Sequence, residues 1–169
     1  MILEPQGDQA GNMSGMKASL WFTWTLSGSG WADCTIADHS GEAQLLVSYI
    51  TYAPEELIGA VTRLALGEAG DHKVMFEAEP NGYLWHLGPD GDAVDIRIVE
   101  YADASVRTRP GDVLWEARHP IEMLARSVLR GFDRVDGDLG EDGWYADWRR
   151  PFPRRELEAL RMAWRKLGM

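Results

Sequence analysis

The chain is poor in the features that build disulfides, membrane spans and secretion signals. It has one cysteine in 169 residues, so no disulfide forms within the chain, and a protein of this size does not need one. No apolar run approaches the roughly 18–20 residues that cross a bilayer. The first residues lack the basic and apolar regions of a signal peptide. We therefore expect a cytoplasmic protein.

Positive charge is also scarce. Lys and Arg together number 17 against 27 Asp and Glu, which gives a net charge of −10. Binding to nucleic-acid phosphates needs a surplus of Lys and Arg, so nucleic acid is not expected as a partner. Residues 149–169 carry seven basic and two acidic residues, a net of +5, which leaves −15 for residues 1–148. We expect this basic end to pack against the acidic body, within one chain or across a two-fold homodimer.

The familiar cofactor and metal motifs are missing as well. The sequence has no GxxxxGK[ST] loop and no GxGxxG between a strand and a helix, which argues against the usual nucleotide sites. The histidines show no HxxxH or HxH spacing and there is no CxxC, so no metal site is predicted. They are His39, His72, His86 and His119. We predict no cofactor, and no membrane partner.

What the sequence does contain is a clear run of secondary-structure patterns. Alternating apolar residues and short turns predict three strands near 18–51 and four more between 72 and 119. Apolar stripes at helical spacing predict helices at 53–67, 119–135 and 152–168, with a short helix before the last. The strands cluster instead of alternating with helices. The prediction is therefore α+β: one antiparallel sheet of six or seven strands, with helices mainly on one face. Residues 1–17 are predicted as a flexible tail and 18–169 as a single domain.

The segment "DCTIADH" holds the candidate residues for an enzyme. Nucleophilic or metal chemistry would need its polar groups to converge at hydrogen-bond or ligand distance. On a strand, Cys34 shares a face with Ile36, which is the pattern of a buried cysteine. The remaining candidates for a hydrolase-type site are Asp33, Asp38 and His39, and no catalytic residue is assigned.

Eight tryptophans are many for this length. Trp24 lies on the apolar face of its strand and is predicted to be core. Trp21 and Trp31 lie beside Thr and Asp on the opposite face, where they could stack a sugar or another small ligand. We expect the C-terminal segments to cover this face, and a ligand-binding module is the alternative.

Residues 133–150, "DRVDGDLGEDGWYADWRR", contain six carboxylates. The EF-hand pattern fails there because Gly140 and Glu141 occupy its fifth and sixth positions. A catalytic pair of acids would need an apolar setting that this polar segment lacks. Two interpretations remain: a solvated connection, or a surface that binds a basic protein partner. The residues of that surface would be Asp136, Asp138, Glu141, Asp142, Trp144 and Trp148.

The pattern "WTLSGSGWADCTIADH" with the ending "PFPRRELEALR" resembles small uncharacterised actinobacterial proteins. The motifs of this resemblance are structural, and no site residue follows from it. At the level of fold class and charge, the chain is also similar to bacterial immunity proteins, which neutralise a basic toxin through an acidic face. The leading hypothesis is a non-enzymatic protein that acts by binding a protein partner.

Overall fold

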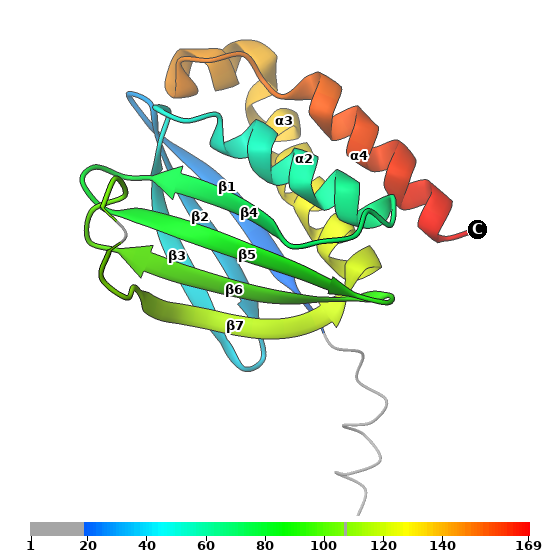
Figure 1. Cartoon of the computed structure of the whole chain (residues 1–169). Helices are drawn as coiled ribbons and strands as arrows, with labels where there is room; N and C mark the ends of the chain where they lie inside the picture. The colour runs from blue at the N-terminus through cyan, green and yellow to red at the C-terminus, as the bar shows by residue number, and fades with distance from the viewer. Residues whose placement is uncertain (1–18, 107) are drawn as a thin grey trace, which may run out of the picture.

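The structure is a computed structural model, and it describes residues 19–106 and 108–169 of the chain. The predicted tail, residues 1–17, lies outside the described residues. Along the chain, three strands are followed by a helix, four strands and two helices. This order confirms the predicted α+β class (Figure 1).

The first sheet is a three-stranded antiparallel meander of β1 (Trp21–Gly28), β2 (Trp31–Asp38) and β3 (Gly41–Ser48). A two-residue turn joins β1 to β2, with φ of 58° at Ser29 and 80° at Gly30. Positive φ at both positions matches the twist of neighbouring strands and so favours a tight hairpin. Buried and exposed residues alternate along β1, so one face of this sheet lies on the core.

The second sheet contains β4 (His72–Glu77), β5 (Gly82–Asp90), β6 (Ala93–Tyr101) and β7 (Asp112–Pro120), in that order. The prediction of a single sheet of six or seven strands is therefore wrong. The sequence separates β3 from β4 by a helix, and the two sheets face one another instead of continuing edge to edge. Ring contacts across the core show this: Phe22 and Trp85 are 6.5 Å apart, and Trp24 and Phe76 are 6.0 Å apart.

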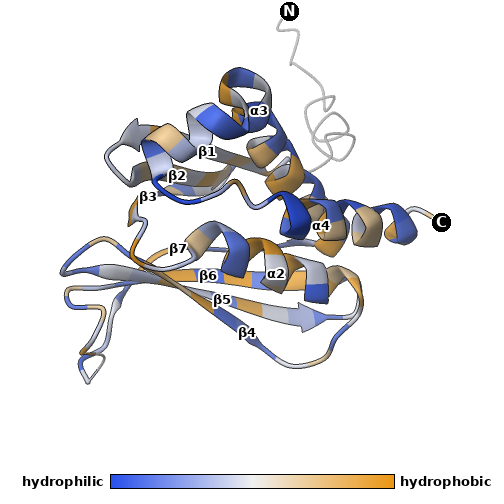
Figure 2. Cartoon of the chain, turned by 90° about the horizontal axis from the view of Figure 1, so that it is seen from above, coloured by the Kyte–Doolittle hydropathy of each residue, from blue (hydrophilic) through white to orange (hydrophobic). Residues whose placement is uncertain are grey.

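The helices fill the side of the molecule where β1 and β4 are the edge strands (Figure 2). They are α2 (Ala53–Ala65), α3 (Ile121–Trp148) and α4 (Arg154–Leu167). α3 packs against β1, α2 packs against β4, and α4 packs against both other helices. The helices thus close the gap between two sheets, whereas the sequence analysis placed them mainly on one face of one sheet.

An aromatic cluster forms the core beneath α3. Trp24 contacts Phe132, Trp144 and Trp148, with ring centroids 5.3, 6.3 and 5.5 Å apart respectively. α3 reaches this cluster from two directions because Gly140 has φ 69° and ψ 175°, which breaks the helix into two segments. Glycine suits such a position because side chains are strained at positive φ.

Candidate functional site

The acidic segment 133–150 is mostly helical, and its two tryptophans point inward. Trp144 and Trp148 are both 0 % exposed. They lie one turn apart in the second segment of α3, so both face the core. The sequence analysis placed these two side chains on a partner-binding surface, but they are core residues and present no area to a partner.

The acids of this segment are partly neutralised by the basic end of the same chain. Arg154 of α4 forms ion pairs with Asp136 and Glu141. Two turns further along α4, Arg161 binds both carboxylate oxygens of Asp133, at 2.6 and 2.9 Å. The basic end therefore packs against the acidic body within one chain, which is one of the two arrangements that the charge pattern predicted.

Two carboxylates of the predicted surface have no ion-pair partner among residues 19–106 and 108–169. Asp138 and Asp142 are exposed, and neither makes an ion pair with any part of the chain that the structure describes. Asp142 lies three residues before Tyr145, whose side chain is 57 % exposed. Residues at this spacing lie on one face of a helix. An acid and an aromatic ring therefore stand side by side on the surface.

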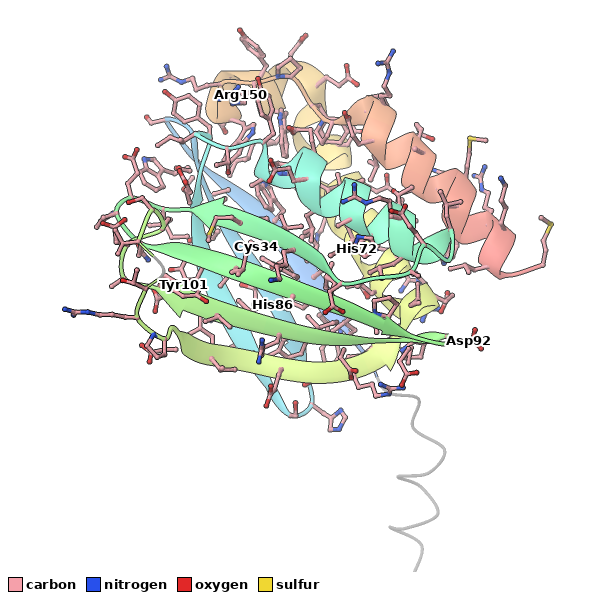
Figure 3. The ribbon with its side chains drawn as sticks, viewed as in Figure 1. Cys34, His72, His86, Asp92, Tyr101 and Arg150 are labelled. Carbon is pink, nitrogen blue, oxygen red and sulfur yellow. The ribbon has the colours of Figure 1, made fainter. Side chains whose placement is uncertain are left out.

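Further large side chains are exposed at the same end of the molecule. Tyr49, Ile50 and Tyr52 lie between β3 and α2 and are 40 %, 41 % and 55 % exposed. Arg150, just beyond the end of α3, donates hydrogen bonds to the carbonyl oxygens of Tyr49 and Ile50. Its guanidinium also lies 4.3 Å from the ring centre of Tyr52. Figure 3 shows Arg150 beside this connection. The contacts bring residues 49–52 next to the end of α3, a neighbourhood that sequence spacing did not reveal.

The outer face of the first sheet is open at β1. Trp21 is 56 % exposed, so the expectation that C-terminal segments cover it is wrong: those segments lie along the edge of β1. Trp31 is half-buried and packs against the core. Trp21 pairs with Ala37, six residues along β2 from Trp31, which is about 20 Å in an extended strand. The two tryptophans therefore do not form one stacking platform.

The candidate catalytic residues do not converge. Asp33 is exposed on the outer face of β2, and His39 is exposed in the following turn. Asp38 instead points to His119 of β7. The two residues are 81 positions apart in sequence, so no local motif could indicate that they are partners. The distance between Asp38 Oδ2 and His119 Nε2 is 2.8 Å, and the two side chains are only 4 % and 3 % exposed.

The Asp38–His119 pair joins the end of one sheet to the end of the other. Burial alone would raise the pKa of Asp38, but hydrogen bonds from Ser40 and His119 outweigh it and lower the pKa to about 2. The other ring nitrogen of His119 is buried and has no hydrogen-bond partner among the described residues, so it offers no accessible site for proton transfer. The pair therefore has a structural role: it links β2 of the first sheet to β7 of the second sheet.

Cys34 is fully buried, and burial raises the pKa of its thiol well above the ordinary value. A thiol held in the neutral form is a poor nucleophile, and the side chain behaves as a core residue. Among residues 19–106 and 108–169, no three His, Cys, Asp or Glu side chains are arranged to hold a metal ion. Over the same residues, no helix has the length and apolar character needed to cross a membrane.

Comparison of the chain with protein-family models, with curated proteins and with solved structures finds no match.

Proposed function

We propose that the protein acts in the cytoplasm by binding a protein partner, in the manner of the immunity proteins that it resembles in fold class and charge. The observation that carries this proposal is the exposed aromatic end of the molecule: Tyr49, Ile50 and Tyr52, which Arg150 contacts, and Tyr145 in the second segment of α3. Exposed apolar side chains that are grouped together often mark interaction surfaces, whereas single scattered ones do not.

The composition of this aromatic end is that of an interface. Tyr and Arg, together with Trp, are enriched among the energetically dominant contacts at protein–protein interfaces. Arg150 fixes the backbone of the 49–52 connection through two hydrogen bonds, so less freedom is lost when a partner binds. The rings are therefore presented in a largely preformed arrangement.

The net charge of the chain and one carboxylate beside Tyr145 favour a basic partner. Asp142 lies on the exposed side of α3 next to Tyr145, Glu141 beside it is ion-paired with Arg154, and the whole chain carries a net charge of −10. Complementary charge accelerates association and discriminates among partners. Of the predicted acidic surface this proposal keeps Asp142, with Tyr145 and Tyr52 as the aromatic residues in place of the two buried tryptophans.

Affinity purification of the tagged full chain from cells of its source tests the proposal. A basic protein should be recovered with the wild type, and recovery should fall in Tyr52→Ala/Tyr145→Ala and in Asp142→Lys. Met162→Ala is the matched control, because Met162 is 61 % exposed on α4, and it should retain the partner. No recovery at low or physiological salt, or equal recovery with all variants, would contradict the proposal.

A second candidate, a module for small ligands or carbohydrates, is supported by the exposure of Trp21 beside the threonines of β1. Titration of a panel of sugars and metabolites, followed by tryptophan fluorescence, tests it with Trp21→Ala as control. The absence of any shift that depends on Trp21 would exclude this candidate.

A further inference from the structure

A groove runs between β1 and α3, and its two walls differ in chemistry. It has a volume of about 630 Å³. One wall carries Trp21, Thr23 and Thr25 of β1, and the other carries three arginines of α3. These are Arg126, Arg130 and Arg134. The chain has a net charge of −10, so the three arginines give this wall of the groove a positive charge that contrasts with the rest of the molecule.

The strand and the helix run side by side in matched steps. Ser127 donates a hydrogen bond to the carbonyl oxygen of Leu20. One turn later Gly131 meets Phe22, where an added Cβ would lie 2.9 Å from the carbonyl oxygen. Four residues of helix advance about 6 Å, and two residues of strand advance about 6.8 Å. The contacts therefore repeat in register and form the floor of the groove.

The positions of the three arginines follow from this register. Each one precedes by one residue a position of α3 that faces β1, so the arginines form a row along the rim of the groove. On the opposite rim, Trp21, Thr23 and Thr25 follow Leu20, Phe22 and Trp24, the positions that face α3. The two rims thus carry parallel rows, with guanidinium groups on one side and hydroxyl groups and an indole on the other.

Within the described residues, two of the three arginines have no carboxylate partner. Arg126 lies 3.7 Å from Glu122. Arg130 and Arg134 are exposed, and the described part of the chain gives them no ion pair. Asp138 and Asp147 also line the groove, at the end beyond Arg134. Positive charge is therefore concentrated along the stretch from Arg126 to Arg134.

We propose that this groove binds an extended, acidic peptide segment of a partner protein. Carboxylates on alternate residues of an extended peptide are about 6.8 Å apart, close to the 6 Å step between successive arginines. Three acidic residues at positions i, i+2 and i+4 can therefore face Arg126, Arg130 and Arg134. The intervening main chain can hydrogen-bond with the hydroxyl groups of Thr23 and Thr25. The surface is separate from the aromatic end, so the inference does not rest on the proposed function.

A pair of labelled nine-residue peptides of Glu and Thr, with both ends blocked, tests this proposal by fluorescence anisotropy on the full chain. One peptide alternates Glu and Thr, and the other has the same composition with its Glu residues consecutive. The alternating peptide should bind more tightly. The Arg130→Ala/Arg134→Ala variant should weaken its binding by at least about tenfold, because charge-assisted hydrogen bonds are lost.

Arg165→Ala is the matched control, because it removes one exposed arginine from α4 and leaves the groove intact. It should change the affinity by less than about twofold. Amide chemical shifts of Thr23 and Thr25 should move on titration with the alternating peptide. Four outcomes would each overturn the proposal. The two peptides could bind with equal affinity, or Arg165→Ala could weaken binding as much as Arg130→Ala/Arg134→Ala does. The shifts of Thr23 and Thr25 could stay unmoved, or a single-stranded oligonucleotide could bind more tightly than the alternating peptide.

Discussion

Replacing Gly131 with alanine should destabilise the protein, whereas the same substitution at Gly137 of the same helix should stabilise it. Gly131 lies where the backbone of α3 approaches β1. A Cβ there would lie 2.5 Å from Cδ1 of Phe22 and 2.9 Å from its carbonyl oxygen. At Gly137 no heavy atom of a neighbouring residue lies within 4 Å of the added Cβ. The two positions therefore separate packing from helix propensity.

The expected magnitudes follow from two opposing free energies. Alanine in place of glycine inside a helix stabilises by about 1 kcal/mol, and at Gly137 this is the whole effect. Overfilling a packed site costs about 1–3 kcal/mol. At Gly131 the upper part of that range applies, because one of the two close atoms belongs to the backbone and cannot rotate away. The net result at Gly131 is a loss of about 1–2 kcal/mol.

Urea unfolding followed by tryptophan fluorescence measures both variants, and the core tryptophans make that signal strong. The two free energies of unfolding should differ by about 2–3 kcal/mol. A thermal midpoint in a protein of this size shifts by about 2–4 °C per kcal/mol. Gly131→Ala as stable as Gly137→Ala would refute the close approach of α3 and β1, and with it the register on which the arginine groove depends.

Two further predictions concern the buried carboxylate of Asp38 and the half-buried carboxylate of Glu55. Because the pKa of Asp38 falls from 3.8 to about 2 on folding, its ionised form contributes about 2 kcal/mol above pH 4; this contribution is lost as the pH falls toward 2. Asp38→Ala should lose this contribution at pH 7 and make stability less dependent on pH below pH 4. An unchanged acid profile would contradict the lowered pKa of Asp38. Burial, and then repulsion by Glu156, raise the pKa of Glu55 from 4.5 to about 7, so the charged form opposes folding increasingly as the pH rises from 4.5 through 7. Glu55→Gln should therefore stabilise the protein by about 1 kcal/mol at pH 8, after allowance for solvent screening, and have little effect at pH 4. Thermal melts measure this difference, and equal stabilisation at pH 4 and pH 8 would exclude the charge of Glu55 as the cause.

The order and type of the elements could be predicted from the sequence because both are set by local patterns. Period-two alternation marks β1 and β2, and the apolar stripe of α2 has helical spacing. Which strands share a sheet is a different question, since it depends on contacts between distant segments. The connection through α2 allows β4 either to extend the first sheet or to begin a second one, and no local pattern distinguishes these outcomes.

The site predictions failed where tertiary packing decides exposure. Trp144 and Trp148 stand among acids in sequence, yet the kink at Gly140 turns their side of the helix onto the core. The spacing of four residues between them was the available signal, because it places both rings on one face. The arginine row has the same spacing and is equally visible in the sequence. Its significance depends on β1, which lies more than one hundred residues earlier in the chain.

That separation sets the order in which the protein can fold during its synthesis. Phe22 and Trp24 leave the ribosome early, but their ring partners Phe132, Trp144 and Trp148 are made more than one hundred residues later. At about 5–20 residues per second, this delay is on the order of 5–25 s. During that time the apolar face of the first sheet has no helix to cover it, so we expect the nascent chain to be a substrate for chaperones until α3 emerges.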